Sequence, residues 1–523
     1  MPSKTSLAFA ACLSTLAACG GQSSAFNEGM SLLEPPVALD SDIVFVDGLR
    51  HQAVLLDAAS KSPAPSPKAT VDLPFGPSMA VRRNGHDEAL VLCVGQRSSL
   101  DADAKPAALA VVGPSGSLRT YDLGTTPFDT LVQSDDGRYA VVFRSKNDDG
   151  RLLNNANELA VIDLDGKAGT ISSVTPKTPQ SFGHTPTGAV FSPTMDIAGE
   201  RRRLLVVLSA AEVTLIDLNH LTRRETIVQL GDTGRTISPV QVLFGATEPT
   251  LYVRGSASND IFAFHLEAYQ NTPGGNDFRP SINQLGGGAG PADMVLFSEG
   301  GAEQLLVTAQ SGAQAIVIDP RSSKATSIAL PTAADHILLF TATAPHDAKT
   351  LQRALLYRAG GQEVDFLDLA DVESRRERNL ETLALDAPIG AVIPLLAEGK
   401  LVLLNSGTGV SVLDLAARSI APITSSSALS TATFDANKQR LWVAPQGQPR
   451  VGTFDLKTGA TDEILLDQPI HTFLPMFNAK RIAIVHDSNI GYVTFIDSDT
   501  PSRKSAVSVR GFFIADILDR GEK

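Results

Sequence analysis

The sequence predicts an all-β fold made of repeated four-stranded units, and three observations support this prediction. Short apolar runs rich in β-branched residues alternate with clusters of Gly, Pro, Asn, Asp and Ser along most of the chain. An apolar strand that ends in Asp recurs, as in VTLID ending at Asp217 and VTFID ending at Asp497. The 523 residues are 43% apolar, which is enough to bury a large core.

The residues that close these apolar runs set the length of the repeat. They fall at Asp57, Gly113, Asp163, Asp217, His265, Asp319, Asp368, Asp414, Asp455 and Asp497, so consecutive units are 41 to 56 residues long. Repeats of this length with several strands each are typical of a β-propeller, in which four-stranded antiparallel blades stack around an axis. We therefore predict about ten blades between residues 41 and 519.

The unit around Asp217 shows how one blade is filled. Its four expected strands are 187-TGAVFSP-193, 203-RLLVVLS-209, 213-VTLID-217 and 225-ETIVQL-230. A single blade of this kind has two apolar faces and buries them only against neighbours, so the blades must form a ring. The recurrent Asp is expected to cap the tight turn that follows its strand through its own side chain.

The two ends of the repeat region indicate how the ring closes. The first unit has only three strands, 42–46, 53–57 and 69–73, and the chain ends in the strand-like segment 512-FFIAD-516. We expect this last strand to pair with 42–46 and complete the first blade, which removes an exposed edge. Ordinary propellers have four to eight blades, so two smaller propellers in tandem are the alternative, with a hinge in the long insertion 267–291.

The N-terminus predicts export and lipid anchoring. Lys4 precedes an apolar run from Leu7 to Ala18, which fits the central region of a signal peptide. The run ends in 16-LAAC-19, which resembles the bacterial lipobox. The resemblance implies that residues 1–18 are removed and that Cys19 is acylated, which would anchor the chain stably. An ordinary secretory signal is the alternative.

These features divide the chain into four parts and predict a location. Residues 1–18 are the signal peptide, 19–40 a lipidated tether, 41–519 the propeller and 520–523 a short tail. Gly20 follows the cysteine where an Asp would mark retention, which points to the outer membrane of the bacterial cell envelope. Partners are then the membrane itself and a protein or envelope polymer.

The repeat also resembles a known group, the YVTN-type bacterial β-propellers. Their repeat joins a V-x-V-I-D-L strand and turn to an S-P-D-G-K-x-L-Y-V hairpin. Similar segments here are 134-SDDGRYAVV-142, 434-FDANKQRLWV-443 and 251-LYVRG-255. The resemblance covers about residues 41–519 and implies a β-propeller. The chain departs from the pattern in lacking the sequence LYVTN and in its ten units.

Composition and motifs disfavour several function classes. The net charge of −13 repels phosphate backbones, so nucleic acid is not an expected partner. Metal-binding motifs such as HExxH and CxxC, phosphate-binding glycine loops and the GxSxG nucleophile motif do not occur in the sequence. We therefore assign no catalytic residue, metal or cofactor.

Three arginines form a candidate binding site for an anion. Arg144, Arg254 and Arg358 each follow the second strand of a unit, at the end where ligand-binding loops gather. If they converge, they line a funnel that attracts carboxylate or phosphate. The alternative is that each arginine pairs with an acidic residue of a neighbouring loop.

The leading functional hypothesis is a non-enzymatic, membrane-anchored lipoprotein that binds a protein or envelope ligand through the loops on one face of the propeller. One alternative is an enzyme of the lactonase or quinoprotein kind with its site in the central channel. Another is an outer-membrane assembly factor that binds exposed strand edges of client proteins. The fold alone does not choose between them.

Overall fold

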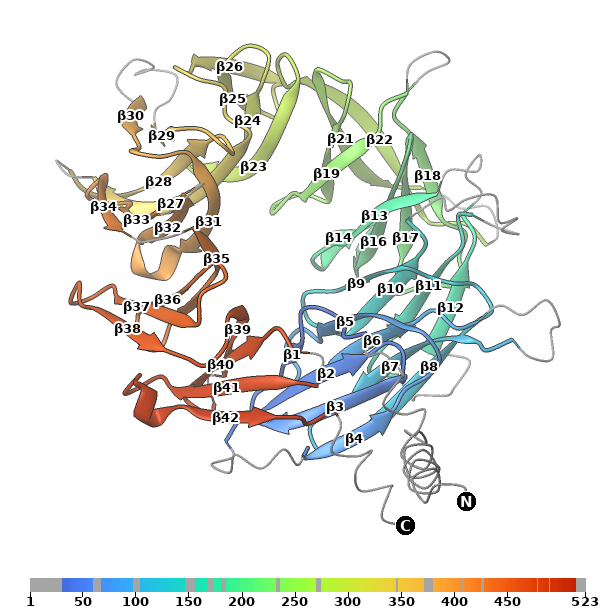
Figure 1. Cartoon of the computed structure of the whole chain (residues 1–523). Coiled ribbons are helices and arrows are strands. Elements are labelled where there is room, and N and C mark those ends of the chain that lie inside the picture. The colour runs from blue at the N-terminus through green and yellow to red at the C-terminus, as the bar shows by residue number, and fades with distance from the viewer. Residues whose placement is uncertain are drawn as a thin grey trace, which may run out of the picture.

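The structure is a β-propeller of ten four-stranded antiparallel blades (Figure 1). It is a computed structural model that describes residues 31–59, 67–96, 104–145, 156–166, 173–179, 185–231, 236–269, 274–344, 347–370, 380–405, 409–424, 428–476, 478–488 and 490–513. The predicted signal peptide and Cys19 lie outside these residues, as does the tail 520–523. No helix in the described part of the chain is long and apolar enough to cross a membrane.

Each blade is built from four strands that follow one another in the chain, with the first strand next to the axis and the fourth at the periphery (Figure 1). The first five blades contain β1 (Val37–Ala38), β2 (Asp42–Asp47), β3 (Gln52–Asp57) and β4 (Ala69–Asp72); β5 (Pro77–Arg82), β6 (Ala89–Cys93), β7 (Ala107–Val112) and β8 (Leu118–Gly124); β9 (Thr130–Gln133), β10 (Tyr139–Phe143), β11 (Leu159–Asp163) and β12 (Val174–Lys177); β13 (Pro186–Phe191), β16 (Leu204–Ser209), β17 (Glu212–Asp217) and β18 (Thr226–Gln229); and β19 (Pro239–Phe244), β20 (Thr250–Gly255), β21 (Asp260–Ala268) and β22 (Phe278–Gly286). A separate hairpin, β14 (Met195–Ile197) with β15 (Glu200–Arg202), is inserted in blade 4.

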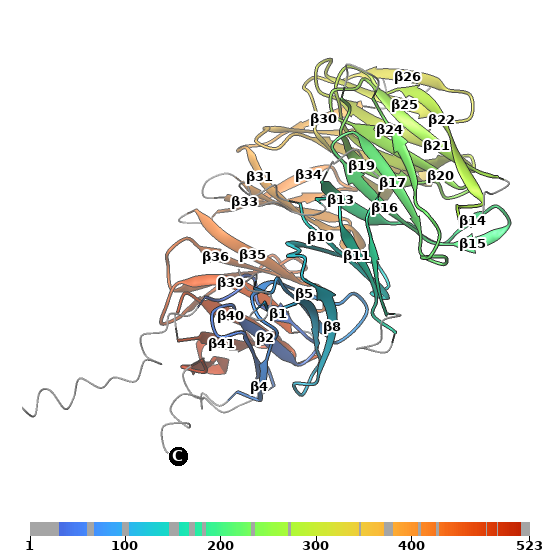
Figure 2. The same cartoon turned by 90° about the vertical axis from the view of Figure 1, so that its right-hand side faces the viewer.

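The second half of the chain repeats this arrangement. Blades 6 to 10 contain β23 (Pro291–Glu299), β24 (Ala302–Ala309), β25 (Gln314–Asp319) and β26 (Lys324–Ala329); β27 (His336–Ala344), β28 (Asp347–Tyr357), β29 (Glu363–Asp368) and β30 (Leu380–Ala384); β31 (Ile389–Leu395), β32 (Lys400–Asn405), β33 (Gly409–Asp414) and β34 (Ser419–Thr424); β35 (Leu429–Asp435), β36 (Arg440–Pro445), β37 (Arg450–Asp455) and β38 (Thr461–Leu465); and β39 (Ile470–Met476), β40 (Arg481–His486), β41 (Tyr492–Asp497) and β42 (Val507–Arg510). Two short 3-10 helices, Leu396–Glu398 and Arg503–Ser505, lie in blades 8 and 10. In the view of Figure 2, blades 1 and 10 lie at one end of the ring and blades 5 and 6 at the other.

The core is divided among the joints between blades. Successive side chains of a strand point to opposite faces of its sheet, so each blade presents apolar residues to both neighbours. Leu215 of β17, for example, packs against blade 5, while the next residue, Ile216, packs against blade 3. The described residues form ten such apolar clusters, one at each joint, and one of them joins blade 10 to blade 1. The ring is therefore closed by the same packing that holds its interior.

The recurrent Asp has the structural role that the sequence predicts. Its carboxylate accepts a hydrogen bond from the backbone N–H two residues later, which fixes the turn between the third and fourth strands. The distance is 2.9 Å from Asn219 to Asp217, 3.0 Å from Ala416 to Asp414 and 2.8 Å from Asp499 to Asp497. The same bond occurs at Asp57, Asp163, Asp319 and Asp455.

A second repeated contact joins neighbouring blades at the same face of the ring. The first residue of a second strand donates from its cationic side chain to the backbone carbonyl that follows the turn Asp of the next blade. Lys400 reaches Leu456 in this way at 3.3 Å and Arg440 reaches Ser498 at 2.8 Å. Arg481 of blade 10 donates to the carbonyl of Ala58 in blade 1 at 2.9 Å, so this contact also crosses the closing joint.

The strand that completes the first blade is not the one expected from the sequence. Val37 and Ala38 form β1 and pair with Val44 and Ile43 of β2, so the innermost strand of blade 1 comes from the N-terminal side of β2. A hairpin between adjacent segments closes a very short loop, whereas pairing with 512–516 would close a loop of almost the whole chain. Phe512 and Phe513 instead pack their rings against Phe45, with centroids 4.8 and 5.6 Å apart, and residues 514–516 lie outside the described part.

The alternative of two tandem propellers is wrong, and so is a hinge in the insertion 267–291. In place of a hinge, β21 and β22 are nine residues long and remain paired out to Ala268 and Phe278. Blades 5 and 6 on either side share a continuous apolar cluster that includes Tyr252 and Met294. The insertion therefore lengthens one hairpin of a single ring.

An ionic network fastens this long hairpin to the inserted hairpin of blade 4. Arg202 is buried, and it bonds to Asp277 of the β21–β22 connection, to Asp217 at 3.1 Å and to Glu200 at 2.6 Å. Arg223 also reaches Asp277 at 3.1 Å. The hydrogen bond from Arg202 lowers the pKa of Asp277 from its ordinary value near 3.8 to about 2.

The lowered pKa predicts how stability depends on pH. Because the folded state favours the Asp277 carboxylate, its contribution is complete above about pH 4 and is lost as the pH falls towards 2. Asp277→Asn should therefore reduce the free energy of unfolding at pH 7, and its difference from the wild type should shrink between pH 4 and pH 2. Urea unfolding over this range measures both effects, with Asp196→Asn, at an exposed position of β14, as the control.

The contact across the closing joint gives a second prediction. Arg481→Met removes a charged donor from the carbonyl of Ala58 and should lower the free energy of unfolding by about 2 kcal/mol. Arg440→Met removes the equivalent contact inside the ring and should cost a similar amount. Chemical denaturation measures both changes. If Arg440→Met lowers the free energy of unfolding and Arg481→Met does not, the joint between blades 10 and 1 is not held by the same contact as the joints inside the ring.

Candidate functional site

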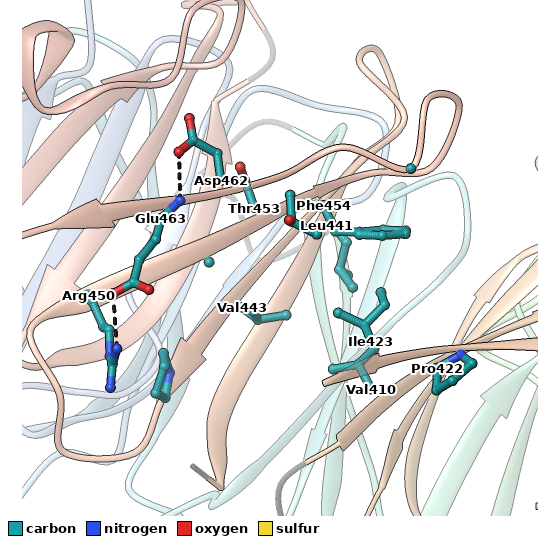
Figure 3. Close-up of a pocket in the computed structure, with 14 residues that line it drawn as sticks. Val410, Pro422, Ile423, Leu441, Val443, Arg450, Thr453, Phe454, Asp462 and Glu463 are labelled. Atoms are coloured by element: carbon teal, nitrogen blue, oxygen red, sulfur yellow. Dashed lines mark hydrogen bonds and ion pairs between the residues drawn. The ribbon is translucent and has the colours of Figure 1, made fainter. Parts of the chain in front are cut away.

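A groove between blades 8 and 9 is a candidate binding site. It has a volume of about 610 Å³, and its lining includes residues of the outermost strands of both blades, β34 and β38. Figure 3 shows the lining side chains. Its blade 8 wall comes from β33 and β34, and its blade 9 wall comes from β36, β37 and β38. The lining residues are Val410, Pro422, Ile423, Leu441, Val443, Pro445, Arg450, Gly452, Thr453, Phe454, Gly459, Thr461, Asp462 and Glu463.

The groove exists because the joint between blades 8 and 9 is incompletely filled. Its apolar cluster has six buried residues in the described part of the chain, whereas the other nine clusters have ten to seventeen. Gly452 lies three residues before the turn Asp of blade 9, on the face directed at blade 8. In blades 4, 7, 8 and 10 the equivalent position holds a buried side chain, Thr214, Asp365, Ser411 or Thr494. A Cβ atom on Gly452 would lie 2.9 Å from a methyl group of Val443.

One end of the groove is apolar and the other is polar. Val410, Ile423, Leu441 and Phe454 gather at the apolar end, as Figure 3 shows. Of these, Ile423 and Phe454 remain partly exposed, as does Val443 beside them. Such a surface gains free energy when an apolar group of a ligand covers it, by about 25 cal/mol per Å² of apolar area buried.

The polar end carries one cation and two carboxylates. Arg450 donates to Glu463 at 3.0 Å and also bonds to Gln448. Asp462 accepts a hydrogen bond from the backbone N–H of Glu463 at 2.8 Å (Figure 3). No cation among the described residues pairs with Asp462. Glu463 pairs in register with Gly452 and lies on the groove face, whereas Asp462 pairs with Thr453 and lies on the opposite face of the sheet. The groove face of this end therefore carries the Arg450–Glu463 ion pair, with a formal charge of zero.

The three predicted arginines do not form one site. Arg254 is the last residue but one of β20. It donates to Gln241 of its own blade at 2.9 Å and to the carbonyl of Pro291 of blade 6 at 3.0 Å. Burial lowers its pKa, and the carboxylate of Asp293 opposes that shift. Arg254 therefore braces two neighbouring blades.

Arg144 and Arg358 have different surroundings from Arg254 and from each other. Arg144 is buried just beyond β10, and Arg358 is exposed just beyond β28. In each blade, one residue of the second strand pairs across the sheet with the residue that closes the third strand. Arg144 and Arg358 lie five residues after that position in the chain, whereas Arg254 lies four residues after it. A shift of one residue directs a side chain to the opposite face of a sheet, so the three positions are not equivalent.

Two other cavities lie at joints between blades. One, of about 600 Å³, lies where blade 10 meets blade 1 and is lined by Glu34, Phe45, His486, Tyr492 and Phe513 among others. The other, of about 250 Å³, lies between blades 5 and 6 around Tyr252 and Glu303. In the described residues no group of three or more His, Cys, Asp or Glu side chains is placed to hold a metal ion.

Comparison with known proteins adds no assignment of function. No family model matches the chain, and no curated protein matches it. Among solved structures, the dihydro-heme d1 dehydrogenase NirN in complex with DHE is 12% identical, with a TM-score of 0.43 over 82% of this chain and 74% of NirN. The Dos1 propeller is 10% identical, with a TM-score of 0.38 over 73% and 92% of the two chains. Apo AztD from Citrobacter koseri is 13% identical, with a TM-score of 0.34 over 69% and 87%.

The contacts of Arg254 and Arg358 predict different consequences of their removal. Arg254→Ala leaves the carbonyl of Pro291 without its donor and should lower the free energy of unfolding by about 1–3 kcal/mol. Arg358→Ala removes an exposed side chain and should change it by less than about 0.5 kcal/mol. Denaturant unfolding tests both. An unchanged stability in Arg254→Ala would contradict its bracing role.

Proposed function

We propose that this protein is a lipid-anchored, non-enzymatic binding protein of the bacterial cell envelope, and that it binds a protein or another envelope component in the groove between blades 8 and 9. The observation that carries the proposal is the groove itself. It is an open, partly apolar cavity at the joint whose apolar cluster has the fewest buried residues in the described part of the chain. The sequence predicted that the ligand contacts the loops on one face of the propeller. The proposal instead assigns the contact to the groove, whose lining residues are known.

The proposed anchor would hold the ring close to a membrane. The carbonyl of Ser31 accepts a hydrogen bond from Gly48 at 2.6 Å, and Leu33 donates to Val46 at 2.9 Å, so both residues are fixed to blade 1. An extended chain spans about 3.3–3.6 Å per residue, so a lipid on Cys19 would hold Ser31 within about 40 Å of the bilayer. Acylation of Cys19 in the outer membrane therefore confines the ring to the envelope.

The groove suits a binding role because both of its walls belong to packed sheets. Val410 and Leu441 are buried and belong to the apolar cluster between blades 8 and 9, so the floor of the groove is fixed. A site that exists before its ligand arrives binds with a smaller loss of conformational entropy. Binding of this kind needs no catalytic group, and the proposal assigns none.

Crosslinking in intact cells followed by purification of the chain tests this function. Wild type should capture a specific envelope protein, and Cys19→Ser, which cannot be acylated, should lose the protein from the membrane fraction and reduce that capture. The two forms should be compared at equal expression. Retention of Cys19→Ser in the membrane fraction would contradict the lipid anchor, and an absence of any specific partner with wild type would contradict the binding role.

A further inference from the structure

We propose that the cavity between blades 5 and 6 is a second binding site, and that it takes a primary alkylammonium group. The basis is a carboxylate that faces this cavity without a cationic partner, together with the polar side chains around it. The cavity has a volume of about 250 Å³, which is smaller than the usual pocket for a drug-sized ligand and suits a smaller group. It lies at a different joint from the groove between blades 8 and 9, so the inference does not rest on the proposed function.

Two lengthened hairpins build the walls of this cavity. In most other blades the third strand ends at an Asp that caps the following turn, but in blade 5 β21 continues past His265 to Ala268. In blade 6, β23 and β24 likewise remain paired out to Glu299 and Ala302. His265 therefore has no turn to cap, and its side chain is one of those that line the cavity.

The strand register directs three polar side chains into this joint. Tyr252 belongs to the apolar cluster between blades 5 and 6, as does Ala263. His265 lies two residues after Ala263, and alternate residues of a strand point to the same face, so His265 also faces blade 6. Glu303 lies two residues before Leu305, which contributes to this cluster from blade 6, so Glu303 faces blade 5. Tyr252, His265 and Glu303 all line the cavity.

Glu303 is a partly buried carboxylate that neutral donors hold in place. Its Oε1 atom accepts a hydrogen bond from the hydroxyl of Tyr252 at 3.1 Å, and its Oε2 atom accepts one from the backbone N–H of Ala246 at 2.5 Å. The one cation in the described lining, Arg321, is engaged by Glu248 at 3.2 Å. Among the described residues no cationic side chain forms an ion pair with Glu303, so its charge is available to a ligand.

The charge of the lining selects a cation. The described lining carries two carboxylates and one guanidinium, so its formal charge is −1 with His265 counted as neutral. Burial raises the pKa of Tyr252, and the carboxylate of Glu303 adds to that shift, so the phenol stays protonated and adds no charge. A partly desolvated carboxylate is stabilised by an opposite charge within hydrogen-bonding distance.

The hydrogen-bonding groups and the volume favour an ammonium group with a short chain. A primary ammonium has three N–H donors, and the lining offers acceptors in the Glu303 carboxylate, the Tyr252 oxygen and the Asn283 amide oxygen. The Nδ1 atom of His265 is hydrogen-bonded to Thr250 at 2.9 Å, so Nε2 is the ring nitrogen available to the ligand. A volume of about 250 Å³ accommodates a short alkyl chain as well as the charged group.

The n-butylammonium ion is a direct probe, titrated against the full-length protein at pH 7 and followed by saturation-transfer difference NMR. We expect it to bind with a dissociation constant on the order of 1 mM. Two further probes test the charge, because 1-butanol has the same chain without it and butyrate carries the opposite one. Both should bind at least about tenfold more weakly. Equal binding by 1-butanol would overturn the inference.

Variants of the lining locate the binding. Glu303→Gln keeps the shape of the side chain and removes its charge, so it should weaken butylammonium binding at least about tenfold. Asn283→Lys adds a cation to the lining at an exposed position of β22 and should weaken binding as much. Glu267→Gln removes an exposed charge from the same hairpin outside the lining and should change the affinity by less than about twofold. Undiminished binding by Glu303→Gln, or an equal loss in Glu267→Gln, would overturn the cavity as the site.

A second ammonium probe identifies the source of the ligand. N-acetyl-lysine methylamide carries the same four-carbon chain and ammonium group on a peptide backbone. Tighter binding of this probe than of butylammonium would assign the cavity to a lysine side chain of a partner protein, and weaker binding would assign it to a free amine. Either result supports the ammonium site. Failure of both probes to bind the wild type would overturn the inference and leave the groove between blades 8 and 9 untouched.

Discussion

Every sheet of this propeller is apolar on both faces, and the rest of the structure depends on that constraint. A sheet of this kind is stable only between two neighbours, so the blades have no stable end other than closure into a ring. Residues such as Leu215 and Ile216, adjacent in β17, belong to two different clusters and join three blades together. The cluster containing Phe45 and Phe495 applies the same packing to the first and last blades.

The same constraint explains why an underfilled joint becomes a binding surface. Closure fixes the positions of blades 8 and 9, so these sheets do not collapse onto the groove between them. The cost is a smaller apolar cluster at that joint, which the other nine joints and the repeated cationic contacts offset. A groove of about 610 Å³ with one apolar end and one charged end is the result.

The fold was predictable from the sequence because an Asp closes the third strand in eight of the ten units, and at seven of these positions its carboxylate makes the expected bond to the turn that follows. Closure was not predictable, since a two-residue strand such as Val37–Ala38 leaves almost no pattern and only segment 512–516 had the pattern of a strand for the edge of β2. The three arginines look alike in sequence, but a difference of one position in register separates Arg254 from the others. One feature of the sequence could have indicated the groove. Aligning the repeats places a glycine at position 452, where other blades carry a side chain.

Hydrogen exchange measured blade by blade in the native protein tests the central claim most directly, because amides are protected only where the surrounding packing resists local opening. If the ring is closed by the same shared cores throughout, the central strands of blades 1 and 10, β2, β3, β40 and β41, should exchange as slowly as those of blades 4 and 5. Early exchange of blades 1 and 10 together, ahead of the interior blades, would show that they are open ends and would contradict the account.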